Sequence, residues 1–292
     1  MDLNADGRLD ILSGSYSRKG KSMAGLFQVL WGEEGGGFAV AEPLNGIDGA
    51  PLIIPAETDE HIIDKICTRP TAVDFDGDGD LDIVSGNFKG TFCLFMGEGG
   101  GKFSPRGEIL PMKVDAHSDP VFADWDGDGD LDLLSGSAKG GAFVFTNEGT
   151  RTAPEYGDAV TLLEPVGHPE YGGTPTLGDA HVTGPQADTR LFVDDLNGDG
   201  KLDLLVGDSL TLYLVQDGKT EDQALAALDA HSTSMNALFE DYPVENMGED
   251  GPTPEEEAQI EAWQARMTAV DAERDETVLV ERTGFVWALH RR

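Results

Sequence analysis

The sequence is poor in cysteine and in long apolar runs. Its 292 residues include two cysteines, Cys67 and Cys93, and neither belongs to a CxxC pair of the kind that binds zinc. A disulfide between them is one interpretation, and two buried structural thiols are the favoured one. No stretch is long and apolar enough to cross a membrane, so membrane insertion is not expected.

Positive charge is also scarce. Lysine and arginine total 20, against 55 aspartate and glutamate residues, and the formal net charge is −35 at pH 7. Nucleic acids and anionic membrane surfaces attract basic patches, so neither is an expected partner. Hydrophobic residues make up 39% of the chain, which is enough for a substantial core.

Part of the acidity, 16 of the 55 acidic residues, lies in one nine-residue pattern that occurs four times, at residues 2–10, 74–82, 124–132 and 195–203, named here loops one to four. Each copy has Asp at positions 1, 5 and 9, Asp or Asn at position 3, and Gly at position 6. Oxygen ligands at this spacing can wrap around Ca²⁺, and the main-chain carbonyl of position 7 adds one more. Four copies of one pattern predict up to four calcium sites rather than plain acidic turns. The predicted ligand sets are Asp2, Asn4, Asp6, Arg8 and Asp10; Asp74, Asp76, Asp78, Asp80 and Asp82; Asp124, Asp126, Asp128, Asp130 and Asp132; and Asp195, Asn197, Asp199, Lys201 and Asp203.

The same loops are unlike EF-hand loops. An EF-hand loop ends with a bidentate Glu at position 12 and lies between two helices, whereas position 12 here is serine in three loops and valine in the fourth. The segments before loops two and three, residues 71–73 and 121–123, are short and rich in β-formers. So are the segments that follow, 81–86 and 131–136, and each of these stops at a Gly. We therefore predict that the metal loops join pairs of strands.

The surroundings of the loops repeat as well. Further apolar segments and Gly-rich turns follow loops one, two and three, and each repeat offers about four short strands. Repetition at this scale indicates a propeller, a solenoid or an array, and four short strands per repeat favour a propeller blade. The loops are unevenly spaced, so the longer repeats must hold extended connections, which we predict at 43–60 and 154–188.

On these motifs the chain resembles the FG-GAP/VCBS type of calcium-binding β-propeller repeat. Repeats of this type also occur in integrin α-subunit heads, and the chain is more similar to the bacterial secreted members. The likeness covers roughly residues 1–217 and the last strand near 280–290. It implies an all-β fold, a β-propeller built from four-stranded blades, with calcium loops at the rim between the first two strands of a blade. It also implies a structural role for the metal.

The resemblance carries expectations about the N-terminus and the location. A strand should precede each metal loop, yet loop one begins at Asp2, and no charged n-region or apolar h-region of a signal peptide precedes it. We therefore expect an N-terminally truncated propeller. Weak calcium sites fill where calcium is plentiful, so the expected location is extracellular or the cell envelope.

Residues 218–276 do not fit a blade. Thr220 is a predicted helix N-cap and Pro243 a predicted stop, and a second helix is predicted to begin at the capping box Thr253–Glu256. The predicted apolar faces are Leu225, Leu228, Met235, Leu238 and Phe239 on the first helix, and Ile260, Trp263, Met267 and Val270 on the second.

The predicted domains are therefore propeller blades at 1–217, an inserted helical hairpin at 218–276, and strands at 277–292 that complete the last blade. A separate helical tail is the alternative.

The predicted function is a structural or recognition module for adhesion or ligand binding, with an unknown protein or glycan as partner and without enzymatic activity. Its long connections, 43–68 and 154–190, could contact such a partner. The alternative is a polysaccharide lyase or sugar dehydratase that uses the propeller channel, because such chemistry needs a base near a cation. Candidate bases are His61, His117, His168, Tyr171 and His181, and candidate partners are Arg69 and Arg190.

Overall fold

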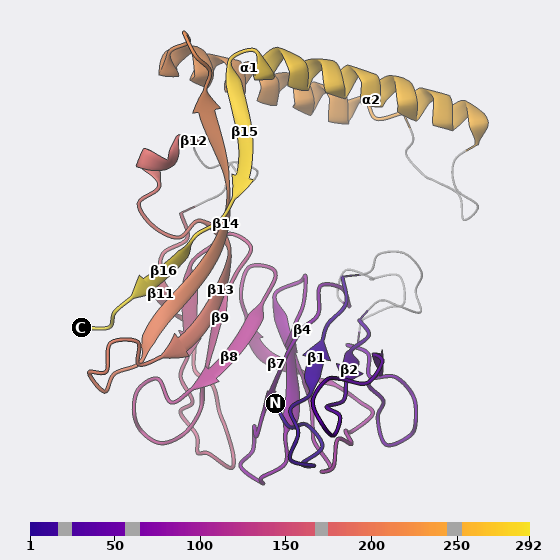
Figure 1. The fold of residues 1–292 in the computed structure, drawn as a ribbon, viewed down its shortest axis with the longest axis vertical. Coiled ribbons are helices and arrows are strands. Elements are labelled where there is room, and N and C mark those ends of the chain that lie inside the picture. Colours follow the sequence, from indigo (N-terminus) through magenta and orange to yellow (C-terminus); the bar gives the residue numbers. More distant parts are fainter. Residues whose placement is uncertain (17–24, 56–64, 167–174, 244–252) are drawn as a thin grey trace. The chain divides into compact units, whose positions relative to one another are not determined.

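The computed structural model describes residues 1–16, 25–55, 65–166, 175–243 and 253–292. These residues are mostly β, in short antiparallel sheets, with two long helices (Figure 1). The chain divides into two compact units. The first comprises Met1–Tyr171, Pro185–Ser209 and Gly284–Arg292, and the second Gly172–Gly184 and Leu210–Thr283.

The first unit contains three sheets in which each strand pairs with the next along the chain. Sheet one is β1 (Ile11–Ser13), β2 (Gln28–Leu30) and β3 (Glu42–Pro43). Sheet two is β4 (Arg69–Val73), β5 (Asp82–Gly86), β6 (Thr91–Phe95) and β7 (Glu108–Lys113). Sheet three is β8 (Asp119–Ala123), β9 (Asp132–Gly136), β10 (Ala142–Phe145) and β11 (Val160–Leu163).

Sheet four combines segments from distant parts of the sequence. In the first unit, β13 (Ala187–Asp194) and β16 (Val286–Leu289) flank the first half of β14 (Asp203–Val215), both antiparallel to it. The four sheets follow one another in order, because β4 contacts β1 and β8, and β8 contacts β13.

The core lies between these sheets. Successive residues of a strand point to opposite faces, so β5 and β9, the second strands of sheets two and three, each contribute to two clusters. Ile83 packs with Phe27 and Val29 of sheet one, whereas its neighbour Val84 packs with Leu133 of sheet three. All five are buried. The alternation of apolar residues in β5 and β9 thus couples sheets two and three to the sheets on both sides.

A repeated contact also joins each sheet to the next, and we call it the latch. Between sheets two and three, the hydroxyl of Ser118 accepts a hydrogen bond from the amide of Asn87 at 3.0 Å, and the amide of Ser118 donates to the Asn87 carbonyl at 3.2 Å. Gly86 lies so close that a Cβ there would be 2.0 Å from the Ser118 carbonyl oxygen. The equivalent hydroxyl bonds join Thr68 to the amide of Ser15 at 2.6 Å and Thr189 to the amide of Ser137 at 3.0 Å.

The strands predicted on either side of loops two and three are confirmed. The expectation that 154–188 is one extended connection was wrong. It contains β11, which pairs with β10, and the short strand β12 (Thr176–Leu177), and it ends inside β13. The run Val160–Leu163 is short enough that neighbouring Gly and Pro residues masked its strand character.

The second unit consists of two helices and the strands beside them. β12 and β15 (Val278–Thr283) flank the second half of β14. The helices are α1 (Glu221–Glu240) and α2 (Pro254–Asp275). Both begin with complete capping boxes, so the predicted caps at Thr220 and Thr253 are confirmed. The predicted domain boundaries at 217 and 276 mark the change from strand-like to helical sequence, whereas the two compact units are defined by contacts between residues. The predicted boundaries therefore stay a prediction.

The predicted apolar face of α1 needs a correction. Ala224, Leu228 and Leu238 are buried, and the first two pack with Val278. Leu225 and Phe239 are exposed instead, since a helix turned by one residue buries Ala224 in place of Leu225. On α2, Trp263 is buried and its indole nitrogen donates to the Leu238 carbonyl at 2.8 Å, which fixes the two helices against each other.

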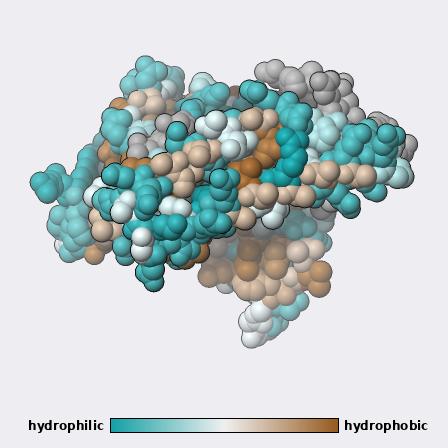
Figure 2. Space-filling model, turned by 90° about the horizontal axis from the view of Figure 1, so that it is seen from above, coloured by the Kyte–Doolittle hydropathy of each residue, from teal (hydrophilic) through white to brown (hydrophobic). Residues whose placement is uncertain are grey.

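Hydrophilic residues cover much of the face shown in Figure 2, with hydrophobic patches between them. Neither helix in the described part of the chain combines the length and apolar character needed to cross a membrane.

Candidate metal centre

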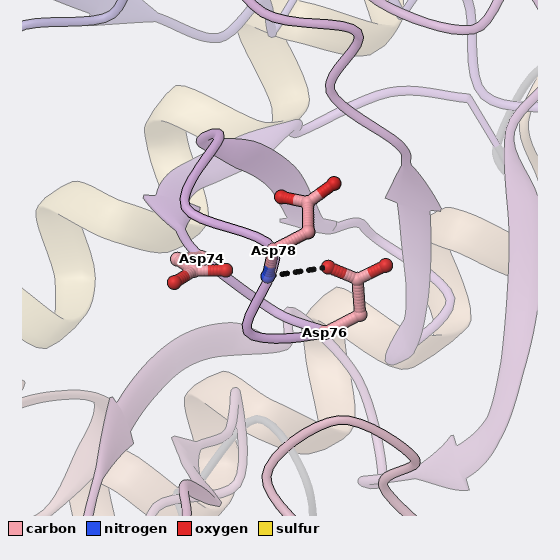
Figure 3. Close-up of side chains that lie close together, drawn as sticks. All are labelled: Asp74, Asp76 and Asp78. Carbon is pink, nitrogen blue, oxygen red and sulfur yellow. Dashed lines mark hydrogen bonds between the residues drawn. The ribbon is translucent and has the colours of Figure 1, made fainter.

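The acidic loops occupy equivalent places in the sheets. Loop two connects β4 to β5, loop three connects β8 to β9, loop four connects β13 to β14, and loop one leads into β1. Figure 3 shows loop two, where the side chains of Asp74, Asp76 and Asp78 lie around a single turn of the backbone. The residues at positions 1, 3 and 5 are therefore brought together by the turn itself.

Carboxylate oxygens converge in two loops. In loop two, one oxygen from each of Asp74, Asp76 and Asp78 lies within 4.8 Å of the others, and Asp124, Asp126 and Asp128 do the same in loop three. Both clusters could hold a metal ion, and an all-oxygen set of carboxylates suits a hard cation. Loops one and four carry Asn at position 3, so positions 1, 3 and 5 there offer two carboxylates and one amide oxygen.

All four loops share one hydrogen-bond pattern. The amide of position 5 donates to the side-chain oxygen of position 3 at 2.8 to 3.2 Å. The amide of position 7 donates to the side-chain oxygen of position 5 at 2.8 to 3.1 Å. Position 6 has φ between 85° and 99° in every loop, a conformation that glycine adopts without strain. The sequence thus specifies the same turn four times.

Asp74 has one carboxylate oxygen that a cation in loop two could contact. Its Oδ2 lies 3.0 Å from Nη2 of Arg151, whereas its Oδ1 is buried and has no hydrogen-bond partner among the described residues. A buried carboxylate oxygen is rarely left without a partner. A cation held together with Asp76 and Asp78 would satisfy this oxygen, and Arg151 would balance part of the remaining charge.

Loop three has a second oxygen of this kind. Asp130, at position 7, is 7% exposed, and its Oδ1 is buried without a hydrogen-bond partner among the described residues. Burial raises the pKa of Asp130, and the nearby carboxylates of Asp128, Asp132 and Asp126 raise it further. The carboxylates of loop three therefore repel one another, and the hydrogen bonds within the loop do not fully compensate for this repulsion.

Position 9 has a different environment from positions 1, 3 and 5. In loop two, Oδ2 of Asp82 accepts a hydrogen bond from the Phe75 amide at 2.7 Å, and Oδ1 accepts one from the Gly97 amide at 2.6 Å. The side chain thus joins the start of its own loop to the end of the third strand. The equivalent bonds join Asp10 to the amides of Leu3 and Gly32, Asp132 to those of Trp125 and Asn147, and Asp203 to those of Leu196 and Arg291.

These position-9 carboxylates are all buried. Burial raises the pKa of Asp82 and of Asp132, while the backbone amides that they accept from oppose the shift. Asp203 differs because the imidazole of His290, 3.0 Å from its Oδ2, lowers its pKa. The hydrogen bonds of position 9 brace the loop, and its role as a metal ligand stays a prediction.

Replacing Asp82 with Ala should destabilise the protein even without calcium. The Phe75 and Gly97 amides would lose their acceptor, and each buried amide left unpaired costs about 1–3 kcal/mol, so we expect a loss of about 3 kcal/mol in free energy of unfolding. The measurement is chemical denaturation in EGTA. Asp78→Ala is the matched control, because it removes a carboxylate of the same loop that accepts from a single exposed amide. Equal losses for the two variants would contradict the bracing role.

Cations of the protein itself occupy parts of some loops. In loop one, the guanidinium of Arg8, at position 7, contacts the carboxylate of Asp6. Arg151 belongs to the segment after β10 and also donates to the Phe75 carbonyl in loop two at 3.3 Å. Arg291, which follows β16, contacts the Trp125 carbonyl in loop three and lies over the Trp125 ring at 4.7 Å. An arginine from the next sheet therefore holds each of loops two and three.

The candidate catalytic residues separate into three groups. His117, Arg69 and Arg190 come together in the first unit, where the sequence pattern did not place them in a common motif. His181 belongs to the second unit, in the 3₁₀ turn η4 (Asp179–His181), with its Nε2 4.0 Å from Glu221. His61, His168 and Tyr171 lie outside the described residues. Sequence reasoning missed Asp119 and Asp188, which also belong to the His117 cluster.

Cys67 and Cys93 are both buried and form no disulfide with each other, so the interpretation as buried thiols is confirmed and the disulfide alternative is wrong. Burial raises the pKa of Cys93 to about 12. This thiol therefore stays protonated at neutral pH and serves the core.

Comparison with known proteins adds one finding. No curated protein matches the chain. Residues 74–135 match the family described as FG-GAP-like repeat. The matched segment runs from loop two through loop three and into β9, so it contains both carboxylate clusters. The chain thus carries an FG-GAP-like repeat at residues 74–135.

Proposed function

We propose that this protein is a calcium-binding recognition module of the extracellular space or cell envelope, in which Ca²⁺ holds the acidic loops together. The observation that carries the proposal is the convergence of the Asp74, Asp76 and Asp78 carboxylates, of which Asp74 has a buried Oδ1 without a hydrogen-bond partner among the described residues. Loops one and four share the backbone pattern of loops two and three, which supports up to four sites.

The electrostatics of the loops support calcium as a structural ion. Close carboxylates repel each other by a few kcal/mol per pair, about 4 kcal/mol at 4 Å with an effective dielectric of about 20. A divalent cation converts this repulsion into attraction. Extracellular modules bind calcium at roughly 10⁻⁴–10⁻³ M, a range that fits loops in which position 5 is exposed in every copy while position 1 is part-buried.

The sheet arrangement supports a propeller-like array. Four sheets succeed one another along the first unit, each packed against the next and joined by the latch, and the metal loops lie between the first two strands of sheets two and three. FG-GAP-like repeats indicate ligand binding or recognition. The proposed role is adhesion or ligand recognition, with a protein or glycan partner and with calcium setting the rigidity of the binding surface.

The test is a calcium titration of the whole chain by isothermal titration calorimetry. We expect up to four ions for the wild type and two fewer for the double variant Asp78→Ala, Asp128→Ala, which removes a carboxylate from each cluster. Asp158→Ala with Asp217→Ala is the matched control, because both aspartates are exposed and outside the loops. A wild type that binds no calcium, or a control that loses as many ions as the loop variant, would show the proposal to be wrong.

A further inference from the structure

A second group of charged side chains lies at the opposite end of the strands from the metal loops. Arg69 is the first residue of β4 and Asp119 the first of β8, whereas the loops follow the last residues of these strands. Each strand has five residues, and a strand rises about 3.3 Å per residue, so the two ends are about 13 Å apart. The group is therefore distinct from the calcium loops.

Specific contacts hold this group together. Nη1 of Arg69 donates to the His117 carbonyl at 2.8 Å, and Nε of Arg190 lies 3.4 Å from Oδ2 of Asp119. Nδ1 of His117 lies 3.2 Å from Oδ1 of Asp188. Three sheets thus contribute to one cluster of two guanidinium groups, one imidazole and two carboxylates.

The backbone presents these residues from equivalent positions. Cys67, His117 and Asp188 have φ of 56°, 52° and 49°, in the left-handed region that non-glycine residues rarely adopt. Each stands directly before the Thr or Ser of a latch, so the same strained turn recurs at the same end of sheets two, three and four. Strained residues of this kind gather where a structure positions functional groups.

The charges of the cluster are unevenly paired. The Asp119 carboxylate contacts the Arg190 guanidinium, and the Asp188 carboxylate contacts the His117 ring. Arg69 has no carboxylate within 4.0 Å among the described residues. Arg69 is half-buried, and both this burial and the nearby charge of Arg190 lower its pKa, while the carboxylates of Asp119 and Asp188, which lie nearby without contacting it, oppose the shift. In a chain with 55 acidic residues, a half-buried guanidinium without a contacting carboxylate is unexpected on electrostatic grounds.

The imidazole offers a further unsatisfied group. Asp188 holds Nδ1 of His117, and the ring packs on Phe88 with centroids 4.6 Å apart. Among the described residues, Nε2 has no hydrogen-bond partner. The His117 side chain is 17% exposed, and those of Arg190 and Asp188 are 33% and 42% exposed, so solvent reaches the cluster.

We propose that Arg69, Arg190 and His117 form a binding site for a small organic monocarboxylate. A planar guanidinium matches a carboxylate in geometry and charge, and Arg69 is the group that lacks such a partner. One carboxylate fits because Arg69 alone offers a guanidinium without a contacting carboxylate among the described residues, whereas Asp119 contacts Arg190 and Asp188 contacts the His117 ring. A net charge of −35 also repels polyanions, which favours a small ligand with one carboxylate over an acidic polymer.

The site goes beyond the proposed calcium-dependent role and does not depend on it. The carboxylate could come from a sugar acid or from the C-terminus of a peptide. Glucuronate and N-acetylalanine represent these two sources, and glucose and N-acetylalanine amide are their uncharged counterparts. The experiment is a titration of the full chain with each compound at fixed, saturating calcium, followed by calorimetry or ligand-observed NMR.

We expect one of the carboxylates to bind at millimolar concentration and its uncharged counterpart not to bind, and the tighter of the two identifies the source. Arg69→Gln should weaken binding about tenfold or more, and Arg69→Lys, which keeps the charge but loses the planar fork, should weaken it less. Arg106→Gln, the same change at an exposed arginine outside the cluster, should leave binding unchanged. Thermal melting of each variant establishes that it is folded.

Three results would overturn the proposal. One is a wild type that binds neither carboxylate. Another is unchanged binding in both Arg69→Gln and Arg69→Lys. The third is tighter binding of inorganic phosphate than of either carboxylate, because a dianion site would contradict the charge pairing. None of these results bears on calcium binding in the loops, so the two proposals fail independently.

Discussion

Removing calcium with EGTA is expected to lower the melting temperature by about 20 °C or more. One site at 100-fold excess over its dissociation constant adds about 2.7 kcal/mol to the free energy of unfolding, so four filled sites would add about 11 kcal/mol. For a chain of this size, each kcal/mol shifts the melting temperature by about 2–4 °C. The measurement is thermal unfolding in about 10 mM CaCl₂, which is a 100-fold excess over a dissociation constant of about 10⁻⁴ M, and in excess EGTA.

Two controls separate site binding from general screening of the acidic surface. Sodium chloride at matched ionic strength weakens repulsion between all exposed carboxylates, and it should recover little of the loss. Magnesium demands octahedral geometry and keeps several of its waters, so it should also recover little. The double variant Asp78→Ala, Asp128→Ala should lose about half of the calcium-dependent gain, because its substitutions lie in two of the four loops. An unchanged melting temperature in EGTA would mean that the loops are acidic turns.

The loops could be predicted from sequence because their structure is local. The side chains of positions 3 and 5 accept hydrogen bonds from the amides two residues later, and position 6 is a glycine with positive φ. Each of these features requires a particular residue type at a fixed position in the loop. Strands on either side follow from short β-rich runs. The full ligand sets of the four loops stay a prediction, which the calcium titration addresses.

Position 9 shows where the spacing argument stops. An aspartate at the end of such a loop reads as one more ligand, because its type and place suit a metal. Asp82 uses both oxygens to accept from amides, and one of these, Gly97, lies beyond the next hairpin. The hydrogen bond from the Gly97 amide to Asp82 spans 15 residues and leaves no local sequence pattern. Its presence depends on how β5 and β6 pair, which the loop sequence does not encode.

The charged cluster at the strand starts illustrates the same limit. His117, Arg69 and Arg190 are far apart in sequence and share no motif. They meet because Arg69 begins β4, His117 lies two residues before β8 and Arg190 lies within β13, and because the sheets pack in order. The repeat pattern predicts equivalent strands, but it does not predict which side chains at their ends face one another.

The latch leads to the second large effect, at Gly86. This glycine ends β5, and a Cβ added to it would lie 2.0 Å from the Ser118 carbonyl oxygen and 2.5 Å from the carbonyl carbon. The clash is with main chain, so no side chain can rotate away. The two segments are also tied by hydrogen bonds in both directions between Asn87 and Ser118. Gly86→Ala must therefore push sheets two and three apart or break these bonds.

We expect Gly86→Ala to reduce the free energy of unfolding by about 3 kcal/mol or more, since overpacking alone costs about 1–3 kcal/mol and the lost latch bonds add to it. Gly136→Ala should behave alike, with its Cβ 2.2 Å from the Thr189 carbonyl oxygen. The matched control is Gly207→Ala, the equivalent glycine of sheet four, where the nearest atoms belong to Arg190 at 4.0 Å. The measurement is chemical denaturation in saturating calcium. If all three variants lose the same stability, the effect belongs to glycine in a strand and not to the latch. If only Gly86 and Gly136 are sensitive, close approach between successive sheets explains why the Ser-Gly pair follows both carboxylate clusters.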